Sequence, residues 1–188
     1  MCRFVAYVGK EKILMRELLS QPVNSLIHQS RSARQARSSV NADGFGVAWY
    51  DHDISNIAGI YKSIRPAWND LNLLHLVRMI KSTCFVGHVR DATIGDVSRV
   101  NCHPFFSDQF TFVHNGTVHG FNRLKRHLRK ILTDGSFDLI RGNSDSEHFF
   151  ALLMDHLPQG VGQITVSDLY SALVQSLSRI QSIKLTAG

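Results

Sequence analysis

The chain opens with Met1-Cys2-Arg3-Phe4-Val5-Ala6-Tyr7-Val8, where a cysteine at position 2 is followed closely by an apolar run. Residues 4–8 predict a strand, which would hold the start of the chain in a sheet. Because cysteine is small, we expect Met1 to be removed, leaving Cys2 with a thiol and a free α-amine. An amine with a pKa of about 8 can accept the proton of a thiol with a pKa of about 8.5. Cys2 could therefore be nucleophile and general base at once; the alternative is a buried cysteine that only packs.

Length and composition indicate one globular domain over residues 1–188, since the chain is 44% hydrophobic and can bury a substantial core. Its apolar runs are shorter than the ~18–20 residues of a membrane span, and the N-terminus lacks the pattern of a secretory signal. The three cysteines, Cys2, Cys84 and Cys102, show no disulfide-framework spacing. We therefore expect reduced thiols in a cytoplasmic protein without a membrane partner.

The net charge of +6 gives only a weak preference for anionic partners, because the basic residues are scattered. Two clusters stand out, at residues 31–37 and 125–130. The first is interpreted as a mobile or substrate-flanking loop. The second is interpreted as the solvated face of a helix, because apolar residues take the opposite face. No nucleic-acid-binding module is visible, so no nucleic-acid partner is expected.

Hydrophobic periodicity predicts a mixed α/β (α+β) fold. The expected helices cover residues 13–19, 71–80, 121–132, 144–157 and 169–180. The expected strands cover residues 4–8, 45–50, 57–61, 84–90, 110–114 and 183–186. A polar loop is expected from Asn24 to Asn41, and Asn115-Gly116 is a hairpin signal. Hairpin signals without regular βαβ alternation favour antiparallel sheets.

Arg90 lies at the end of the predicted strand 84–90, in the segment His88-Val89-Arg90-Asp91-Ala92-Thr93. A guanidinium group binds a carboxylate through two parallel hydrogen bonds, which lysine cannot do. Arg90 is therefore a candidate for holding a substrate carboxylate, and Thr93 could add a hydroxyl. The alternative is an internal ion pair with Asp91 or Asp96.

Two further segments offer groups that an amide-cleaving site needs. The Asn115 side chain and the Gly116 N–H can converge on one oxygen and stabilise a tetrahedral intermediate, or they can simply form a type I′ turn. Asp145 lies in the first turn of the helix that Ser144-Asp145-Ser146-Glu147 begins as a capping box. It could bind a substrate ammonium group, or it could only complement the helix dipole.

A metal site is an alternative, because the chain has 10 histidines and because His88, Cys102, His103 and His114 lie on neighbouring predicted elements. The spacings typical of zinc sites are missing. Cys102-His103-Pro104-Phe105 is better interpreted as a rigid wall beside the pocket. Neither a metal nor a cofactor is expected.

Taken in order, these segments resemble the class II glutamine amidotransferases, which are N-terminal-nucleophile hydrolases. The resemblance is strongest to short stand-alone members, including those that cleave γ-glutamyl amides in ergothioneine biosynthesis. It rests on the ordered set Cys2, Asp43-Gly44-Phe45-Gly46, His88–Thr93, Asn101–Phe105, His114-Asn115-Gly116 and Ser144–Glu147. Nearly the whole chain is covered.

The resemblance implies a four-layer αββα sandwich of two mainly antiparallel sheets, here short of its C-terminal strands. It assigns Cys2 as nucleophile, Arg90 and Thr93 to the glutamine α-carboxylate, and Asp145, with the main chain near Gly116, to the α-ammonium group. Asn115 and Gly116 would form the oxyanion hole. The residues expected to line the pocket are Asp43, Gly44, Phe45, Gly46, His88, His103 and His114.

The implied reaction is cleavage of the side-chain amide of glutamine, or of a γ-glutamyl small molecule, through a cysteine thioester. A cysteine amidase with another acyl substrate fits less well, because Arg90 and Asp145 together match an α-amino acid. No synthase domain follows, so the ammonia acceptor would be a separate protein or water. The alternative from another class is a silent, truncated paralogue that acts in binding or oligomerisation, and a homo-oligomer is left open.

Overall fold

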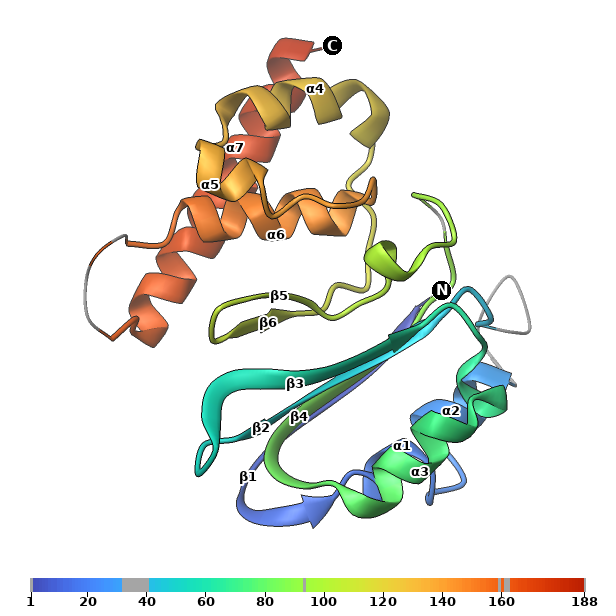
Figure 1. The fold of residues 1–188 in the computed structure, drawn as a ribbon. Coiled ribbons are helices and arrows are strands. Elements are labelled where there is room, and N and C mark those ends of the chain that lie inside the picture. The colour runs from blue at the N-terminus through green and yellow to red at the C-terminus, as the bar shows by residue number, and fades with distance from the viewer. Residues whose placement is uncertain (1, 32–40, 93, 159, 161–162, 188) are drawn as a thin grey trace. The chain divides into compact units, whose positions relative to one another are not determined.

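The computed structural model describes residues 2–31, 41–92, 94–158, 160 and 163–187 (Figure 1). The chain divides into two compact units, Met1–Gly116 and Thr117–Gly188. The N-terminal unit contains all the strands of the described residues, and the C-terminal unit is helical. Each unit is treated separately below.

The main sheet of the N-terminal unit has the strand order β1-β4-β2-β3. Its strands are β1 (Arg3–Leu14), β2 (Phe45–Asp51), β3 (Ser55–Ser63) and β4 (Lys81–Val89). Every pairing is antiparallel, with β4 bonded to β1 on one side and to β2 on the other. A second, two-stranded antiparallel sheet joins β5 (Phe105–Ser107) to β6 (Phe110–Phe112). The predicted mixed α/β fold with antiparallel sheets is confirmed.

Three helices cover one face of the main sheet: α1 (Arg16–Leu19), α2 (Leu26–Arg31) and α3 (Leu71–Met79) (Figure 1). The alternation of strand side chains turns one set toward these helices, as period-2 geometry requires. The resulting core contains Met15, Leu19, Leu26, Ile27, Phe45, Val47, Ala67, Leu73, Val77, Phe85 and Val89. Two single-turn 3₁₀ helices, Ala67–Asn69 and Arg99–Asn101, lie in the connections.

The C-terminal unit consists of α4 (Phe121–Ile131), α5 (Asp134–Phe137), α6 (Asp145–Asp155) and α7 (Val166–Ala187). Helix α4 buries Phe121, Leu124 and Leu128 on one face, as its apolar spacing predicts. Helix α6 begins as predicted, because the Ser144 side chain accepts a hydrogen bond from Glu147 N. None of the helices in the described part of the chain is long and apolar enough to cross a membrane.

Several local predictions are wrong. Ile13 and Leu14 belong to β1 instead of a helix, because they pair with Ser82 and Lys81 of β4. The polar loop expected from Asn24 contains α2, whose Leu26 and Ile27 are buried against the core. Residues 183–186 continue α7 instead of forming a strand, with Ile183 buried. The cluster at 31–37 lies mostly outside the described residues.

The hairpin signal at Asn115-Gly116 is also wrong. Strand β6 ends at Phe112, and the next element of the described chain is a helix. Gly116 does not have the positive φ that a type I′ turn needs, whereas the real β5–β6 turn has Asp108 at φ 48°. Asn115 and Gly116 are instead exposed residues of a connection.

Candidate active site

Cys2 is held against the end of β4. The sheet register pairs Arg3 with Val89, which places Cys2 beside the residues that follow the strand. Asp91 N donates a hydrogen bond to Cys2 Sγ at 3.2 Å, and Sγ lies 3.3 Å from Asp91 O, to which the thiol can donate. Both contacts use the main chain of Asp91, so the thiol has a defined position.

Asp43 fixes the same segment from the other side. Ala92 N donates to Asp43 Oδ2 at 2.7 Å, while Asp43 N donates to Arg90 O at 3.3 Å. Arg90 N in turn donates to Gly44 O at 2.8 Å. The Asp-Gly turn before β2 thus clamps residues 90–92, including the peptide groups that contact Cys2.

Glycine is required at two positions of Asp43-Gly44-Phe45-Gly46, for a different structural reason at each. Gly44 has φ 106°, a conformation that other residues rarely adopt. A Cβ on Gly46 would lie 2.1 Å from His103 O, so only glycine lets this strand approach the segment before β5. The side chain of Phe45, which is predicted to line the pocket, belongs to the hydrophobic core.

Arg90 is a buried cation, 3% exposed. Its Nη1 donates to Asp96 O at 2.8 Å, and its Nη2 donates to Ile94 O and Gly95 O at 3.0 and 3.1 Å. Within the described residues it makes no ion pair with Asp91 or Asp96, so the ion-pair alternative is not what the structure shows. Burying a charge without a counter-ion is costly. An anion bound beside Arg90 would supply that counter-ion.

The three thiols have raised pKa values, each mainly because burial disfavours the thiolate. At Cys2 the Asp91 N–H and the charge of Arg90 partly oppose that effect. The thiol of Cys2 is therefore protonated at neutral pH, and its use as a nucleophile requires a base. Cys102 is fully buried, and its Sγ lies 3.4 Å from Ser98 O, so we interpret it as a packing residue.

Two buried histidines, His88 and His103, lie close enough to Arg90 for its charge to lower the pKa of both rings. The His88 and His103 rings are 4.2 Å apart between centroids, and in the described part of the chain none of their four ring nitrogens has a hydrogen-bond partner. Burial lowers the pKa of His88 to about 3; the nearby main chain of His114 opposes this, and the charge of Arg90 adds to it. Burial likewise holds the pKa of His103 well below its usual range. Among the described residues no group of three or more His, Cys, Asp or Glu is placed to hold a metal ion.

The remaining predicted site residues are Thr93, His114, Asn115, Gly116 and Asp145. Thr93 lies outside the described residues. Asn115 and Gly116 belong to the N-terminal unit and are exposed, and within the described chain neither is hydrogen-bonded to Cys2. His114 is partly buried, and its charge contributes to the low pKa values of His88 and His103.

Asp145 belongs to the C-terminal unit and is 5% exposed. Its Oδ2 accepts from Val118 N at 2.7 Å and its Oδ1 accepts from Ser146 N at 2.9 Å. The carboxylate thus ties the first turn of α6 to the segment that follows Gly116. Only half of the predicted capping box forms, the bond from Glu147 N to the Ser144 side chain. The Glu147 carboxylate accepts from Arg141 N and Gly142 N instead of from Ser144 N.

Sequence reasoning missed two parts of the site. The contacts of Cys2 go to the main chain of Asp91, which residue identity cannot reveal. The sequence predicts Asp43 as a pocket-lining residue and does not predict the bond that its carboxylate accepts from Ala92 N. An Asp before a Gly turn is a common acceptor for main-chain amides, and this is the signal that could have indicated the role.

Comparison with known proteins identifies the family of this chain. Residues 15–184 match the family described as class II glutamine amidotransferases. A probable glutamine amidotransferase, DUG3 of Saccharomyces cerevisiae, is 41% identical over 163 residues, covering 84% of this chain and 46% of that protein. The γ-glutamyl-hercynylcysteine sulfoxide hydrolase of Mycolicibacterium smegmatis is 32% identical over 119 residues, covering 63% and 52%.

A solved structure of a glutamine aminotransferase class-II domain protein from Silicibacter pomeroyi superposes with a TM-score of 0.70 at 25% identity, covering 100% of this chain and 67% of that one. The chain spans about half the length of the two curated relatives, 46% and 52%. The family match covers most of the chain and agrees with the ordered motifs. The chain therefore belongs to the class II glutamine amidotransferase family.

Proposed function

We propose that this chain cleaves the side-chain amide of glutamine, or of a γ-glutamyl small molecule, through an N-terminal cysteine. Removal of Met1 makes Cys2 the first residue and frees its α-amine. That amine takes the thiol proton, and Sγ attacks the amide carbonyl. The tetrahedral intermediate collapses to a γ-glutamyl thioester as the protonated amine returns its proton to the leaving ammonia or amine. Water, activated by the same amine, then attacks the thioester and releases glutamate.

The observation that carries this proposal is the joint position of Cys2 and Arg90 at one end of β4. Asp91 holds the thiol through two main-chain contacts, and the neighbouring Arg90 is buried with carbonyl partners but no carboxylate among the described residues. Guanidinium has five N–H donors, and the three contacts leave two of them for a further acceptor. A substrate α-carboxylate would complete the charge balance of Arg90.

The other roles follow the family pattern. Asn115 and Gly116 would supply the oxyanion hole, Thr93 would assist Arg90, and Asp145 would bind the α-ammonium group. These assignments stay predictions, as do the single-domain description of residues 1–188, the four-layer sandwich, the cytoplasmic location and an ammonia acceptor on another chain. Asp145→Asn tests one of them, because it removes the charge that an ammonium group needs while keeping an acceptor for Val118 N.

The test is glutamate release from glutamine and from γ-glutamyl amides, measured on protein whose intact mass shows whether Met1 is absent. The expected result is activity in processed protein that Cys2→Ala abolishes. Cys84→Ala is the matched control, because Cys84 is also a partly buried thiol with a raised pKa and should be dispensable. Processed protein that releases no glutamate from any of these amides would overturn the proposal and favour a silent binding domain.

A further inference from the structure

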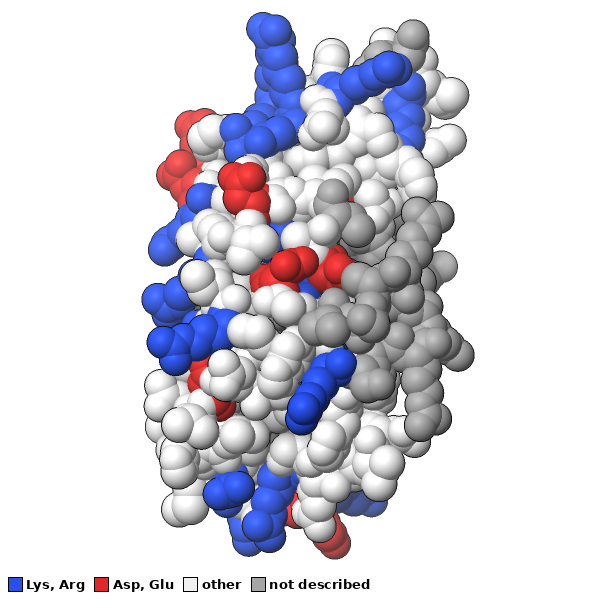
Figure 2. Space-filling view, turned by 90° about the vertical axis from the view of Figure 1, so that its right-hand side faces the viewer, with Lys and Arg blue, Asp and Glu red and all other residues white. Residues whose placement is uncertain are grey.

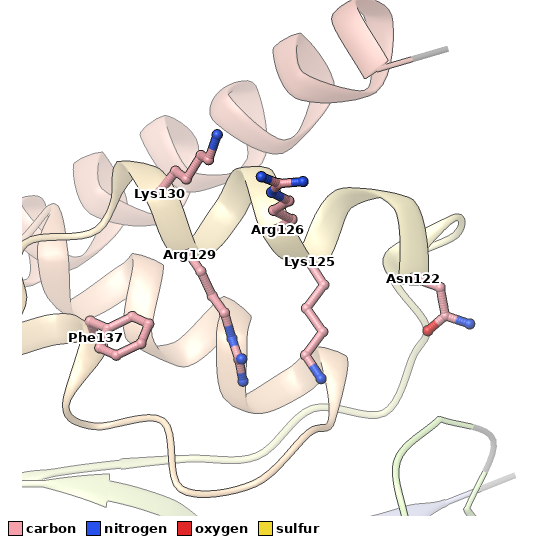
Figure 3. Close-up of a pocket in the computed structure, with 6 residues that line it drawn as sticks. All are labelled: Asn122, Lys125, Arg126, Arg129, Lys130 and Phe137. Atoms are coloured by element: carbon pink, nitrogen blue, oxygen red, sulfur yellow. The ribbon is translucent and has the colours of Figure 1, made fainter.

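A cluster of basic side chains on α4 lies outside the proposed active site and within the C-terminal unit. Lys125, Arg126, Arg129 and Lys130 line a surface cavity of about 450 Å³ together with Asn122 and Phe137 (Figure 3). On the face drawn in Figure 2, Lys and Arg gather over α4 and the end of α7. We call this hollow the α4 cavity.

The α4 cavity holds positive charge without internal compensation. Its lining contains no acidic residue, and among the described residues none of the four cations forms a salt bridge. Lys125–Arg129 and Arg126–Lys130 are like-charge pairs four residues apart, an arrangement that destabilises a helix. Arg129 and Lys130 in the last turn gain from the helix dipole, but Lys125 and Arg126 lie too early for that benefit. A bound anion would relieve this repulsion.

Arg129 is fixed in place by a buried partner. Its Nε donates to His148 Nε2 at 2.9 Å, and His148 Nδ1 lies 2.8 Å from Ser144 O. His148 is fully buried, with its ring edge-on to Phe121 at 4.9 Å. Burial lowers the pKa of His148 to about 4, so the ring is neutral, donates through Nδ1 and accepts at Nε2. The guanidinium is therefore oriented in advance while its two Nη groups stay available.

The remaining lining residues define what could bind. Figure 3 shows Lys125 and Arg129 pointing to one side of α4, with Phe137 next to Arg129, while Arg126 and Lys130 point to the other side of the helix in this view. Phe137 is 44% exposed and offers an apolar wall. Guanidinium groups bind phosphate through two parallel hydrogen bonds, and lysines add point charges. A volume of about 450 Å³ lies within the usual range for small-molecule sites.

We propose that the α4 cavity binds a small anion with two or more phosphate groups, independently of the amide-cleaving site. Arg129 and Arg126 hold phosphate oxygens, Lys125 and Lys130 neutralise the remaining charge, and Phe137 packs against any organic part. Inorganic polyphosphate and a nucleoside polyphosphate share this chemistry.

The test is calorimetric titration of the full chain with tripolyphosphate and with ATP at constant ionic strength. We expect saturable binding of one ligand per chain. The double variant Lys125→Gln/Lys130→Gln should weaken it at least tenfold, because neither side chain makes a hydrogen bond that the fold needs. The matched control Arg16→Gln/Lys81→Gln removes the same charge from exposed positions of the N-terminal unit and should change affinity less than twofold.

Arg129→Lys should also weaken binding, because lysine keeps the charge but lacks the planar guanidinium that His148 orients. A Phe137→Ala variant that loses affinity for ATP alone identifies a nucleotide, and unchanged affinity for both ligands identifies inorganic polyphosphate. The proposal is overturned if titrations do not saturate, if both double variants lose affinity equally, or if a single-stranded oligonucleotide binds more tightly than tripolyphosphate and displaces it.

Discussion

The two units surround their buried histidines differently. In the C-terminal unit both ring nitrogens of His148 have partners, Ser144 O and Arg129 Nε. In the N-terminal unit His88 and His103 are equally buried, yet within the described residues their ring nitrogens have none. Buried polar groups normally have hydrogen-bond partners, and the exceptions are concentrated at functional sites. His88 and His103, the orphaned pair, lie near Arg90, which is two residues after His88 in the chain. His148, whose ring nitrogens both have partners, lies among the helices of the C-terminal unit.

The largest expected effect is on Arg90, the buried cation next to the orphaned pair. Arg90→Gln should lower kcat/KM for glutamine about 100-fold or more, because truncating one partner of a buried charge pair typically costs about 2–5 kcal/mol. Arg90→Lys should recover little, since it lacks the planar fork. Steady-state kinetics measures both, with Arg99→Gln as an exposed control in the following segment. Unchanged kinetics for Arg90→Gln would remove this residue from the substrate site.

The two histidine environments should differ in how much stability they lose when the histidine is replaced by phenylalanine. His148→Phe leaves Arg129 Nε and Ser144 O unpaired, so the free energy of unfolding should fall by about 1–3 kcal/mol. His88→Phe removes two unsatisfied nitrogens and should change it by less than about 1 kcal/mol in either direction. Urea denaturation followed by circular dichroism measures both. An equal loss in the two variants would mean that His88 has partners in solution as good as those of His148.

Asp43 should act on the position of Cys2 more than on substrate affinity. Asp43→Ala removes the acceptor for Ala92 N and should slow Cys2 alkylation and kcat about tenfold, the equivalent of one lost hydrogen bond to a charged group. KM should change little, and Asp43→Asn should recover part of the rate because it keeps an acceptor. Asp53→Ala is the control, since Asp53 is an exposed partner of Lys12 in the β2–β3 turn. Equal effects of the two alanine variants would contradict a positioning role.

The smallest effect is on the pH dependence of stability. His88 and His148 have pKa values lowered to about 3 and about 4, so both are neutral in the folded protein near neutral pH. The unfolded chain takes up protons below about pH 6.5. The stability gained from keeping each ring neutral is complete above that pH and is lost as the pH falls toward the folded pKa values.

Between pH 7 and 6 the loss should be about 1 kcal/mol or less for each histidine. His88→Phe and His148→Phe should each flatten the slope of unfolding free energy against pH over this interval. Denaturation series at several pH values measure the slope. A slope identical to that of the unsubstituted chain would show that the replaced ring titrates in the same way in both states.

Local sequence patterns predict the strands and helices whose hydrophobic residues follow one clear period. The alternation in residues 45–50 and 57–61 predicts the β2–β3 hairpin, and helical spacing predicts α3, α4, α6 and most of α7. The errors at Ile13-Leu14 and at α2 arise where tertiary contacts decide, because strand pairing and core burial override weak local preference. Asn115-Gly116 has hairpin chemistry but no following strand to pair with, so its turn preference is not realised.

The site was predictable to the extent that it uses side-chain chemistry. Cys2 and Arg90 stand out as a nucleophile and a fork-shaped cation, and the structure places them at one end of β4. The clamp on Cys2 was not predictable, because Asp91 acts through its peptide group. The partners of Arg90 were not predictable either, because they are three main-chain carbonyls in the segment that follows it.

The most direct measurement is labelling of Met1-processed protein with a glutamine-analogue alkylator, followed by peptide mapping. The proposed function predicts one modified site, the sulfur of Cys2, with labelling slowed by added glutamine, abolished in Cys2→Ala and unaffected in Cys84→Ala. Labelling of Cys84 or Cys102 instead, or labelling of Cys2 that glutamine does not slow, would contradict a glutamine-binding active site at the end of β4.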